Sequence, residues 1–139
     1  MIGLPPAELD AIRRHAESTY PEECCGVLLG RVERENRCVE AALPLPNGRR
    51  EARTRRFSIG AAEYRAAEAA AEGRGLVLLG FYHSHPDHPA RPSQYDLEHA
   101  LPWHSYVIVA VAAGRADDCT SWILSADRAA FEPEEVSTA

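Results

Sequence analysis

Residues 76–86 read LVLLGFYHSHP and combine a buried strand with a pair of histidines. The first part, Leu76–Tyr82, is almost entirely apolar, which predicts a strand in the middle of a sheet that is covered on both faces. Two histidines follow at His83 and His85. Pro86 has no backbone N–H for a sheet ladder, so it is expected to end the strand. This stretch therefore predicts a central strand that presents two imidazoles at its end.

The two histidines have the spacing of a metal site. Side chains two residues apart in an extended chain point to the same side, so both imidazoles can reach one ion while Ser84 points away. Asp96 follows Ser93 by three residues, about one turn into a predicted helix. Two imidazoles and a carboxylate supply three zinc ligands, and catalytic zinc sites keep the fourth position for water. The pattern predicts one catalytic Zn²⁺ ion and a metallohydrolase.

Each part of this pattern also has a simpler interpretation. A histidine at a strand end is often a hydrogen-bonded surface residue. Ser93 and Asp96 also form a capping pattern, in which the serine caps the helix and the acid complements the helix dipole. A cap does not require an H-x-H-P run upstream at this distance, so the joint occurrence favours the metal site. His99 is either a partner that supports Asp96 or an ordinary polar residue.

A zinc-dependent hydrolase also needs a base. Zinc lowers the pKa of a bound water to about 7, but amide hydrolysis needs a group that takes the water's proton and passes it to the leaving amine. Glu22 and Glu23 precede the apolar run Cys24–Leu29, which is a predicted strand. Either glutamate can project from the strand start into the site, or both can lie in a solvated turn. These residues alone leave the choice open.

Patterns of apolar residues predict three helices and five strands along the chain. The helices are expected at 7–20, 61–72 and 93–100, and the strands at 24–30, 38–43, 76–82, 105–112 and 119–124. Ser58 is expected to cap the second helix, residues 83–92 are expected to be irregular, and the tail from Ser125 has no assigned element. Hairpins and helix-connected strands both occur, so we expect an α/β fold with a mixed sheet flanked by helices.

Composition narrows the class of protein. The 139 residues suit one domain, 1–139. No apolar run approaches the ~20 residues that span a bilayer, and no secretory signal is visible, so a cytoplasmic protein without membrane contact is expected. The formal charge of −6 argues against nucleic-acid binding. All 15 basic residues are arginine, which excludes lysine-based catalysis.

The four cysteines fit no common zinc pattern. They are Cys24, Cys25, Cys38 and Cys119, and we interpret them as small buried residues. A thiol hydrolase that pairs Cys24 or Cys25 with a histidine is chemically feasible. Both cysteines lead into an apolar strand, however, and buried cysteine is usually inert.

The whole pattern resembles the JAMM, or MPN-plus, metalloprotease family. The shared features are the H-S-H-P run, seven residues that end in Ser93, and Asp96, together with a Pro-x-Glu-Cys-x-Gly start. The resemblance covers nearly the whole chain and is greatest to small single-domain prokaryotic members. It implies a fold similar to cytidine deaminases, with His83, His85 and Asp96 as zinc ligands. It also implies that Glu23 is the general base and that Ser93 hydrogen-bonds the tetrahedral oxyanion.

The resemblance implies a reaction as well. It is hydrolysis of a peptide or isopeptide bond after the C-terminal Gly-Gly of a ubiquitin-like protein, which in prokaryotes is often a sulfur carrier. The thin Gly-Gly tail is expected to bind as an extra strand on the sheet edge nearest the zinc, flanked by residues 86–92. The chain is too short to hold at full length both insertions with which eukaryotic members grip ubiquitin.

Several alternatives stay open beside this hypothesis. The same metal site can act on small peptides or cell-wall fragments, or the chain can be a non-catalytic MPN-type binding scaffold. A dense group of arginines either docks an acidic patch of a carrier protein or forms a solvated loop. These arginines are Arg49, Arg50, Arg53, Arg55 and Arg56. The leaving amine and the oligomeric state are not readable from the residues.

Overall fold

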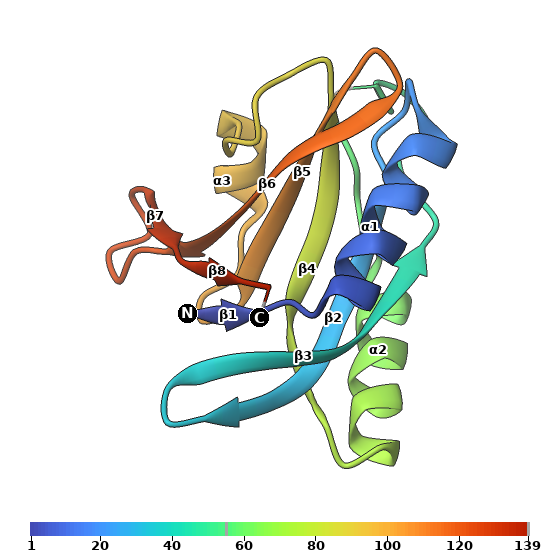
Figure 1. The fold of residues 1–139 in the computed structure, drawn as a ribbon. Coiled ribbons are helices and arrows are strands. Elements are labelled where there is room, and N and C mark those ends of the chain that lie inside the picture. Colours follow the sequence, from blue (N-terminus) through green and yellow to red (C-terminus); the bar gives the residue numbers. More distant parts are fainter. Residues whose placement is uncertain (55, 139) are drawn as a thin grey trace.

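The computed structural model describes residues 1–54 and 56–138, which form one mixed sheet with three helices (Figure 1). The helices are α1 (Pro6–Thr19), α2 (Ala61–Gly73) and α3 (Gln94–His99). The strands are β1 (Ile2–Gly3), β2 (Cys25–Glu33), β3 (Asn36–Leu45), β4 (Val77–Pro86), β5 (Ser105–Ala112), β6 (Arg115–Leu124), β7 (Phe131–Glu134) and β8 (Val136–Ser137). Their order in the sheet is β7-β6-β5-β4-β2-β3-β1-β8.

Strand β4 lies in the interior of the sheet, as its apolar sequence predicts. It pairs antiparallel with β2 and parallel with β5. The strand continues through both histidines and ends at Pro86, so the expectation of an irregular segment is wrong for residues 83–86. The pairing of β4 with β5 extends to Pro86, which lies opposite Val111. This pairing keeps the polar end of β4 in an extended conformation. Both histidines are therefore held by a regular part of the sheet.

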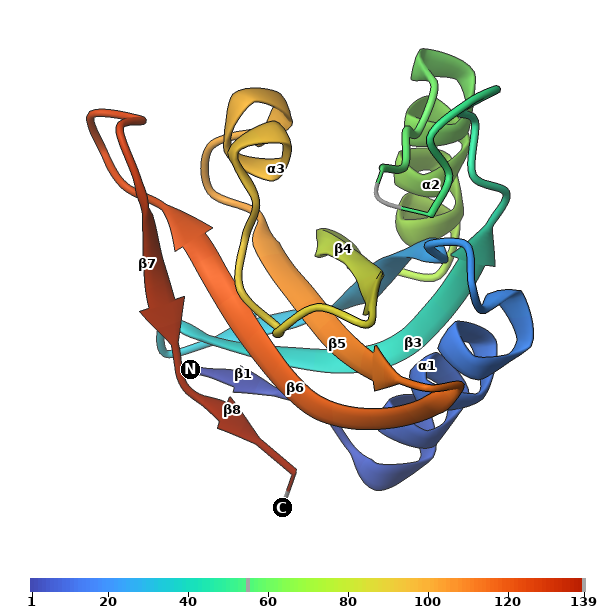
Figure 2. The same ribbon diagram turned by 90° about the horizontal axis from the view of Figure 1, so that it is seen from above.

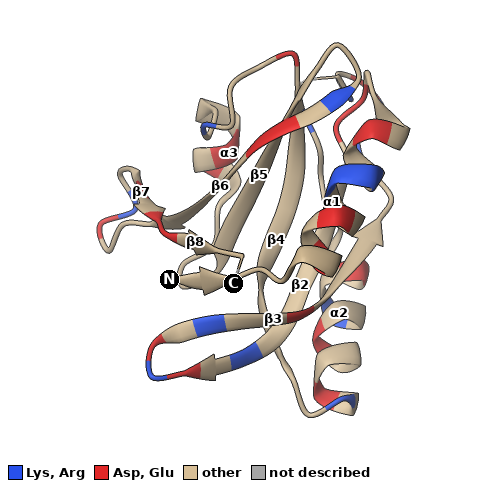
Figure 3. Cartoon of the chain, viewed as in Figure 1, with Lys and Arg blue, Asp and Glu red and all other residues tan. Residues whose placement is uncertain are grey.

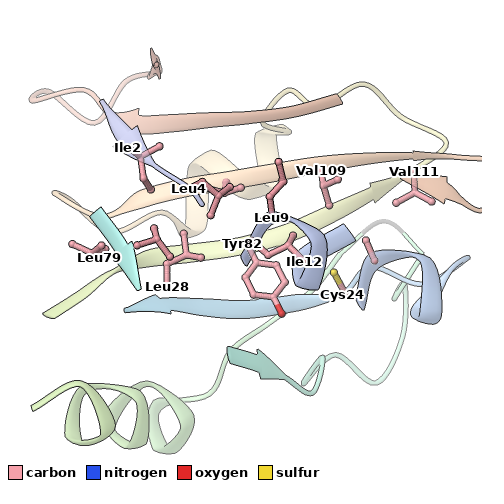
Figure 4. Close-up of a cluster of buried hydrophobic side chains, with 13 residues drawn as sticks. Ile2, Leu4, Leu9, Ile12, Cys24, Leu28, Leu79, Tyr82, Val109 and Val111 are labelled. Atoms are coloured by element: carbon pink, nitrogen blue, oxygen red, sulfur yellow. The ribbon is translucent and has the colours of Figure 1, made fainter. Parts of the chain in front are cut away.

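The two faces of the sheet are covered by different helices. Figure 2 shows α1 on one side of the sheet and α2 and α3 on the other. On the α1 side, Tyr82 and Val109 pack with Leu9 and Ile12 of the helix (Figure 4). On the α2 side, Phe81 belongs to a second cluster with alanines of α2. Because side chains alternate along a strand, residues 83 and 85 face α2 and α3 together with residue 81.

Charged side chains are excluded from the middle of this sheet. Strands β4 and β5 carry none, and Figure 3 shows them on the helices, on the β2–β3 hairpin and on β6. None of the helices formed by the described residues is long and apolar enough to cross a membrane.

Several boundaries differ from the sequence-based expectations. The cap of α2 is Gly60, and none of the described side chains caps the helix, so the predicted role of Ser58 is wrong. The N–H of Ser58 instead donates to the side chain of Asn47. Strand β6 begins at Arg115, four residues earlier than expected, because its polar first half pairs with β5. The short strands β1, β7 and β8 were not predicted.

Candidate metal centre

Strand β4 brings the two imidazoles of the H-x-H pair together. The Nε2 atoms of His83 and His85 lie 3.2 Å apart, and both side chains are buried. Ser84 points to the opposite face, where its Oγ accepts a hydrogen bond from the backbone N–H of Cys24 at 2.8 Å. The expected geometry, with both histidines on one side and the serine on the other, is confirmed.

Helix α3 adds a carboxylate to the pair. The Oδ2 atom of Asp96 lies 3.2 Å from Nε2 of His83 and 3.1 Å from Nε2 of His85. The same carboxylate oxygen accepts the backbone N–H of Ser93, and the Oγ of Ser93 accepts the backbone N–H of Asp96. The capping interpretation and the convergence on the histidines are therefore both correct, because the cap fixes the carboxylate that faces the imidazoles.

The three side chains fit a metal ion. Their ligand atoms form a triangle with sides of 3.1–3.2 Å. In a tetrahedral site with zinc–ligand distances of about 2.0–2.1 Å, neighbouring ligand atoms lie about 3.3–3.4 Å apart. The Nδ1 of His85 lies 2.8 Å from the carbonyl oxygen of Pro89. A carbonyl only accepts, so Nδ1 carries the proton and Nε2 keeps the lone pair that a metal needs.

The charge states of Asp96 and His83 suit the same purpose. Burial acts to raise the pKa of Asp96, but the neighbouring imidazoles and their hydrogen bonds outweigh it and hold this pKa well below its ordinary value. Burial lowers the pKa of His83. An ionised carboxylate and a neutral imidazole are the forms that bind metals. Burial acts to lower the pKa of His85, but its hydrogen bonds to Asp96 and Pro89 outweigh burial and raise this pKa, so a metal ion would have to displace a proton there.

A buried glutamate lies beside the three groups. Glu23 is only 3% exposed, whereas the side chain of Glu22 is 46% exposed. Burial is the main cause that raises the pKa of Glu23 to about 8; the charge of His85 lowers this pKa and that of Asp96 raises it. Cys25 pairs with His83 across β2 and β4, and this register places Glu23 toward His85. A solvated turn is thus the wrong interpretation for Glu23, although it describes Glu22.

The loop between β3 and α2, residues 46–60, covers one side of this group. The ring of Phe57 stacks on His83 with centroids 4.4 Å apart. Phe57, His83, Tyr95 and Asp96 line a mainly apolar pocket of about 170 Å³. Sequence reasoning missed Phe57 and Tyr95, because an aromatic residue in a loop or a short helix gives no signal of what it packs against.

His85 lines a second cavity of about 290 Å³ together with Ser93, His88 and Arg91. His83 and Asp96 thus line one cavity, and His85 lines another.

The arginines of the β3–α2 loop are partly engaged with the protein. The guanidinium groups of Arg49 and Arg56 lie 5.5 and 4.9 Å from the centre of the Tyr95 ring. Arg53 lies 3.8 Å from the carboxylate of Glu22, while Arg50 is exposed. Arg55, which belongs to the predicted docking cluster, lies outside the described residues.

The other candidate residues from the sequence do not belong to the group of His83, His85 and Asp96. The Nδ1 of His99 bonds to the carbonyl oxygen of Tyr95 at 2.8 Å, so His99 bonds within its own helix and not to Asp96. Cys24 and Cys25 are buried free thiols, and burial raises their pKa values to about 11 and about 12. These thiols are poorly suited to nucleophilic catalysis.

The strand that carries the two histidines is not an outer strand of the sheet. Strand β4 lies between β2 and β5, its pairing with β2 ends at His83, and the outer strands are β7 and β8. Phe57, Ser58 and Ile59 of the β3–α2 loop line the aromatic pocket beside Phe81 and His83 of β4.

Comparison with solved structures defines the class of fold. A JAB1/MPN domain protein from Archaeoglobus fulgidus matches 98% of this chain and 95% of its own, with a TM-score of 0.59 at 21% identity. A protein from Desulfitobacterium hafniense matches with a TM-score of 0.86 at 33% identity, over 98% of this chain and 91% of its own. The fold is that of a JAB1/MPN domain.

The sequence identifies the family within this class. The family described as prokaryotic homologs of the JAB domain matches residues 5–125. The chain belongs to this family, so the resemblance drawn from the H-S-H-P pattern is confirmed.

Three relatives carry informative names. The chain is 36% identical to the "Probable TtuB-protein conjugate cleaving protease" of Thermus thermophilus, over 84% of this chain and 74% of that protein. It is 37% identical to the "Desampylase" of Haloferax volcanii, over 76% of each chain. It is 40% identical over 100 residues to "Tail tip assembly protein K" of Escherichia phage N15. That match covers 69% of this chain but only 37% of the phage protein's length.

Proposed function

We propose that this protein is a zinc-dependent hydrolase. Its substrate would be a peptide or isopeptide bond after the C-terminal glycine of a ubiquitin-like or sulfur-carrier protein. The observation that carries the proposal is the triangle of His83, His85 and Asp96 ligand atoms beside a buried glutamate. The names of the Thermus and Haloferax relatives, which span most of this chain, support the substrate class.

The three ligands favour zinc among the common metals. Two imidazoles and one carboxylate in a near-tetrahedral arrangement form a nitrogen and oxygen ligand set of the catalytic zinc type. When bound, the ion would polarise the scissile carbonyl and lower the pKa of a water molecule to about 7. The hydrogen bond from His85 to Pro89 and the cap at Ser93 keep two of the ligands oriented.

Glu23 is the proposed general base. Its carboxylate takes a proton from the attacking water and returns it to the leaving amine. General acid–base catalysis is most efficient when the pKa of the group lies near the working pH. Burial raises the pKa of Glu23 to about 8, and a cation at the ligands would lower it toward neutrality because a nearby positive charge favours the carboxylate. Glu23 is thereby suited to accept and release one proton in each cycle.

Ser93 is the proposed donor to the oxyanion. Its Oγ accepts the N–H of Asp96, which leaves the hydroxyl proton free to be donated. Ser93 lines the cavity beside His85. One donor of this kind is typically worth about 10² to 10³ in rate.

The two cavities provide space for both sides of the scissile bond. A Gly-Gly tail has no side chains and can reach a narrow site in extended form. Because β4 is paired on both sides as far as His83, we propose that the tail lies along the β3–α2 loop and not at a sheet edge. The leaving amine then lies toward the cavity that Ser93 and His88 line.

The test is direct cleavage of defined conjugates. The zinc-loaded protein is incubated with a carrier–cysteine conjugate and a carrier–lysine conjugate, and the products are weighed by mass spectrometry. Release of a carrier with an intact C-terminal glycine from at least one conjugate supports the proposal. Two intact conjugates, with a protein that holds zinc, would refute it.

A second candidate keeps the metal site and changes the substrate. The relative in phage N15 is named for tail tip assembly, and its name does not refer to conjugate cleavage. The same ligands and base would then hydrolyse small peptides or cell-wall fragments. Turnover of short peptides together with inertness toward both conjugates would favour this candidate.

A further inference from the structure

One side chain holds the β3–α2 loop in its shape. The Oδ1 of Asn47 accepts hydrogen bonds from the backbone N–H groups of Arg49, at 3.0 Å, and Ser58, at 3.2 Å. Its Nδ2 donates to the carbonyl oxygens of Arg56, at 2.9 Å, and Glu23, at 3.3 Å. Three of these bonds close the loop, and the fourth connects it to the buried glutamate.

The main chain around the glutamate is fixed from two sides. The N–H of Glu23 donates to the carbonyl oxygen of Arg53 in the loop at 2.6 Å, and the carbonyl of Glu23 accepts from Asn47. The next residue, Cys24, is bonded to Ser84 of β4. Among the described residues, the Oε1 of Glu23 has no hydrogen-bond partner. Its carboxylate is therefore positioned through the backbone more than through its own bonds.

The loop also contacts the ligand group. Phe57 stacks on the ring of His83. The hydroxyl of Tyr95 donates to the carbonyl oxygen of Phe57 at 3.2 Å, and Tyr95 immediately precedes Asp96 in α3. A single loop thus bridges the glutamate, one histidine ligand and the helix that carries the aspartate.

We propose that Asn47 is a positioning residue for Glu23. Its amide holds the carbonyl of Glu23 at a fixed place relative to strand β4. The position of the Glu23 carboxylate depends on this backbone position. This inference rests on the proposed function, in which Glu23 is the base. Displacement of a reacting group by about 1 Å can cost about 10²-fold in rate, so a lost backbone anchor is expected to lower turnover strongly.

Two substitutions distinguish the role of the amide oxygen of Asn47, which accepts hydrogen bonds, from that of its nitrogen, which donates them. Asn47→Ala removes all four bonds, whereas Asn47→Asp keeps the two bonds that the side-chain oxygen accepts and loses both donor bonds, to Glu23 and to Arg56. Both are expected to lower kcat by about 10- to 100-fold on a carrier conjugate and on a short Gly-Gly isopeptide alike. KM for both substrates and the bound zinc are expected to stay within about twofold of the parent values. Asn36→Ala, at the only other asparagine of the chain, is the matched control and should keep full turnover.

A double-mutant cycle shows whether Asn47 acts through Glu23. In the Glu23→Gln background the base is absent, so Asn47→Ala should cause no further loss of the residual rate. A residue that only stabilises the fold would lower the rate by a similar factor in both backgrounds. Independent, multiplying effects of the two substitutions would therefore overturn the inference.

The remaining outcomes are also decisive. Loss of zinc or of the folded state in Asn47→Asp would overturn the inference, because this variant retains two of the three loop-closing bonds. A rise in KM for the carrier conjugate alone, with unchanged kcat, would overturn it in favour of docking. The proposal that Glu23 is the base is contradicted if Glu23→Gln has the same kcat as the parent protein. The inference alone fails if Glu23→Gln is inactive while both Asn47 variants keep the parent kcat.

Discussion

The hydroxyl oxygen of Ser84 accepts a hydrogen bond at 2.8 Å from the backbone N–H of Cys24, and the N–H of Ser84 donates to the carbonyl of Cys24 at 3.2 Å. Both residues are buried. Ser84 lies between the two histidines that are proposed as ligands, and Cys24 follows the proposed base. These two hydrogen bonds therefore set the distance between strand β4 and Glu23. No side chain of the candidate metal centre takes part in them.

Removal of the Ser84 hydroxyl should destabilise the fold. Ser84→Ala leaves the buried N–H of Cys24 without an acceptor, which costs about 1–3 kcal/mol of the free energy of unfolding. Urea titration measures this loss. Ser84→Thr keeps the hydroxyl and should retain more of the stability. Equal losses in both variants would show that this hydrogen bond is unimportant.

Replacement of the buried glutamate should abolish turnover without loss of metal. Glu23→Gln removes the proton acceptor and is expected to lower kcat by about 10² to 10⁴. Glu22→Gln is the matched control, because this neighbouring side chain is 46% exposed, and it should keep its activity. Zinc analysis and steady-state kinetics of both proteins test the assignment, and unchanged turnover in Glu23→Gln would remove this residue from the role of base.

Loss of a ligand should abolish zinc binding. His83→Ala and Asp96→Asn are each expected to weaken zinc binding by more than about 100-fold. Loss of a residue that only hydrogen-bonds to a metal ligand typically costs about 10- to 100-fold in metal affinity. His88→Ala is the control, because this exposed histidine lies in the same segment without belonging to the ligand group. Competition with a chelator dye measures the affinities. Full zinc affinity in His83→Ala would contradict the site.

Metal removal and thiol modification should have opposite effects. A chelator is expected to abolish hydrolysis, and added zinc should restore it. An alkylating reagent applied to the folded protein at neutral pH should leave the rate unchanged, because Cys24 and Cys25 are buried and their pKa values are raised to about 11 and about 12. Inhibition by the alkylating reagent alone would support the thiol hydrolase instead.

The exposed arginines of the β3–α2 loop are the best candidates for carrier docking. Arg49 and Arg56 lie over the ring of Tyr95 and Arg53 pairs with Glu22, so the exposed Arg50 is the described arginine best placed to meet a partner. Arg50→Glu should raise KM for an acidic carrier conjugate, because charges at the rim of an interface steer association. KM for a short Gly-Gly isopeptide should not change. An equal rise for both substrates would exclude docking, and Arg34→Glu in the β2–β3 turn is the charge control.

The sequence predicts the parts of the site that local geometry determines. The period of two in a strand places His83 and His85 on one side, and a cap places Asp96 at the start of a helix. The assignment of Glu23 over Glu22 needs the register of β2 against β4, which is a contact between distant segments.

Other features arise only from tertiary contacts. Strands β1, β7 and β8 have two to four residues, too few for a periodic pattern. Asn47 lies in a loop, and its bond to Glu23 joins residues 24 positions apart. A loop asparagine next to glycine predicts a turn, and nothing in its sequence context shows which backbone groups its amide will bind.

Anomalous scattering from crystals of the zinc-loaded protein, measured at the zinc absorption edge, tests the ligand assignment most directly. We expect one zinc ion within about 2.0–2.2 Å of the Nε2 atoms of His83 and His85 and a carboxylate oxygen of Asp96, with no fourth protein ligand. A zinc ion bound elsewhere, or one closed off by a fourth protein side chain, would contradict a catalytic metal centre in this protein.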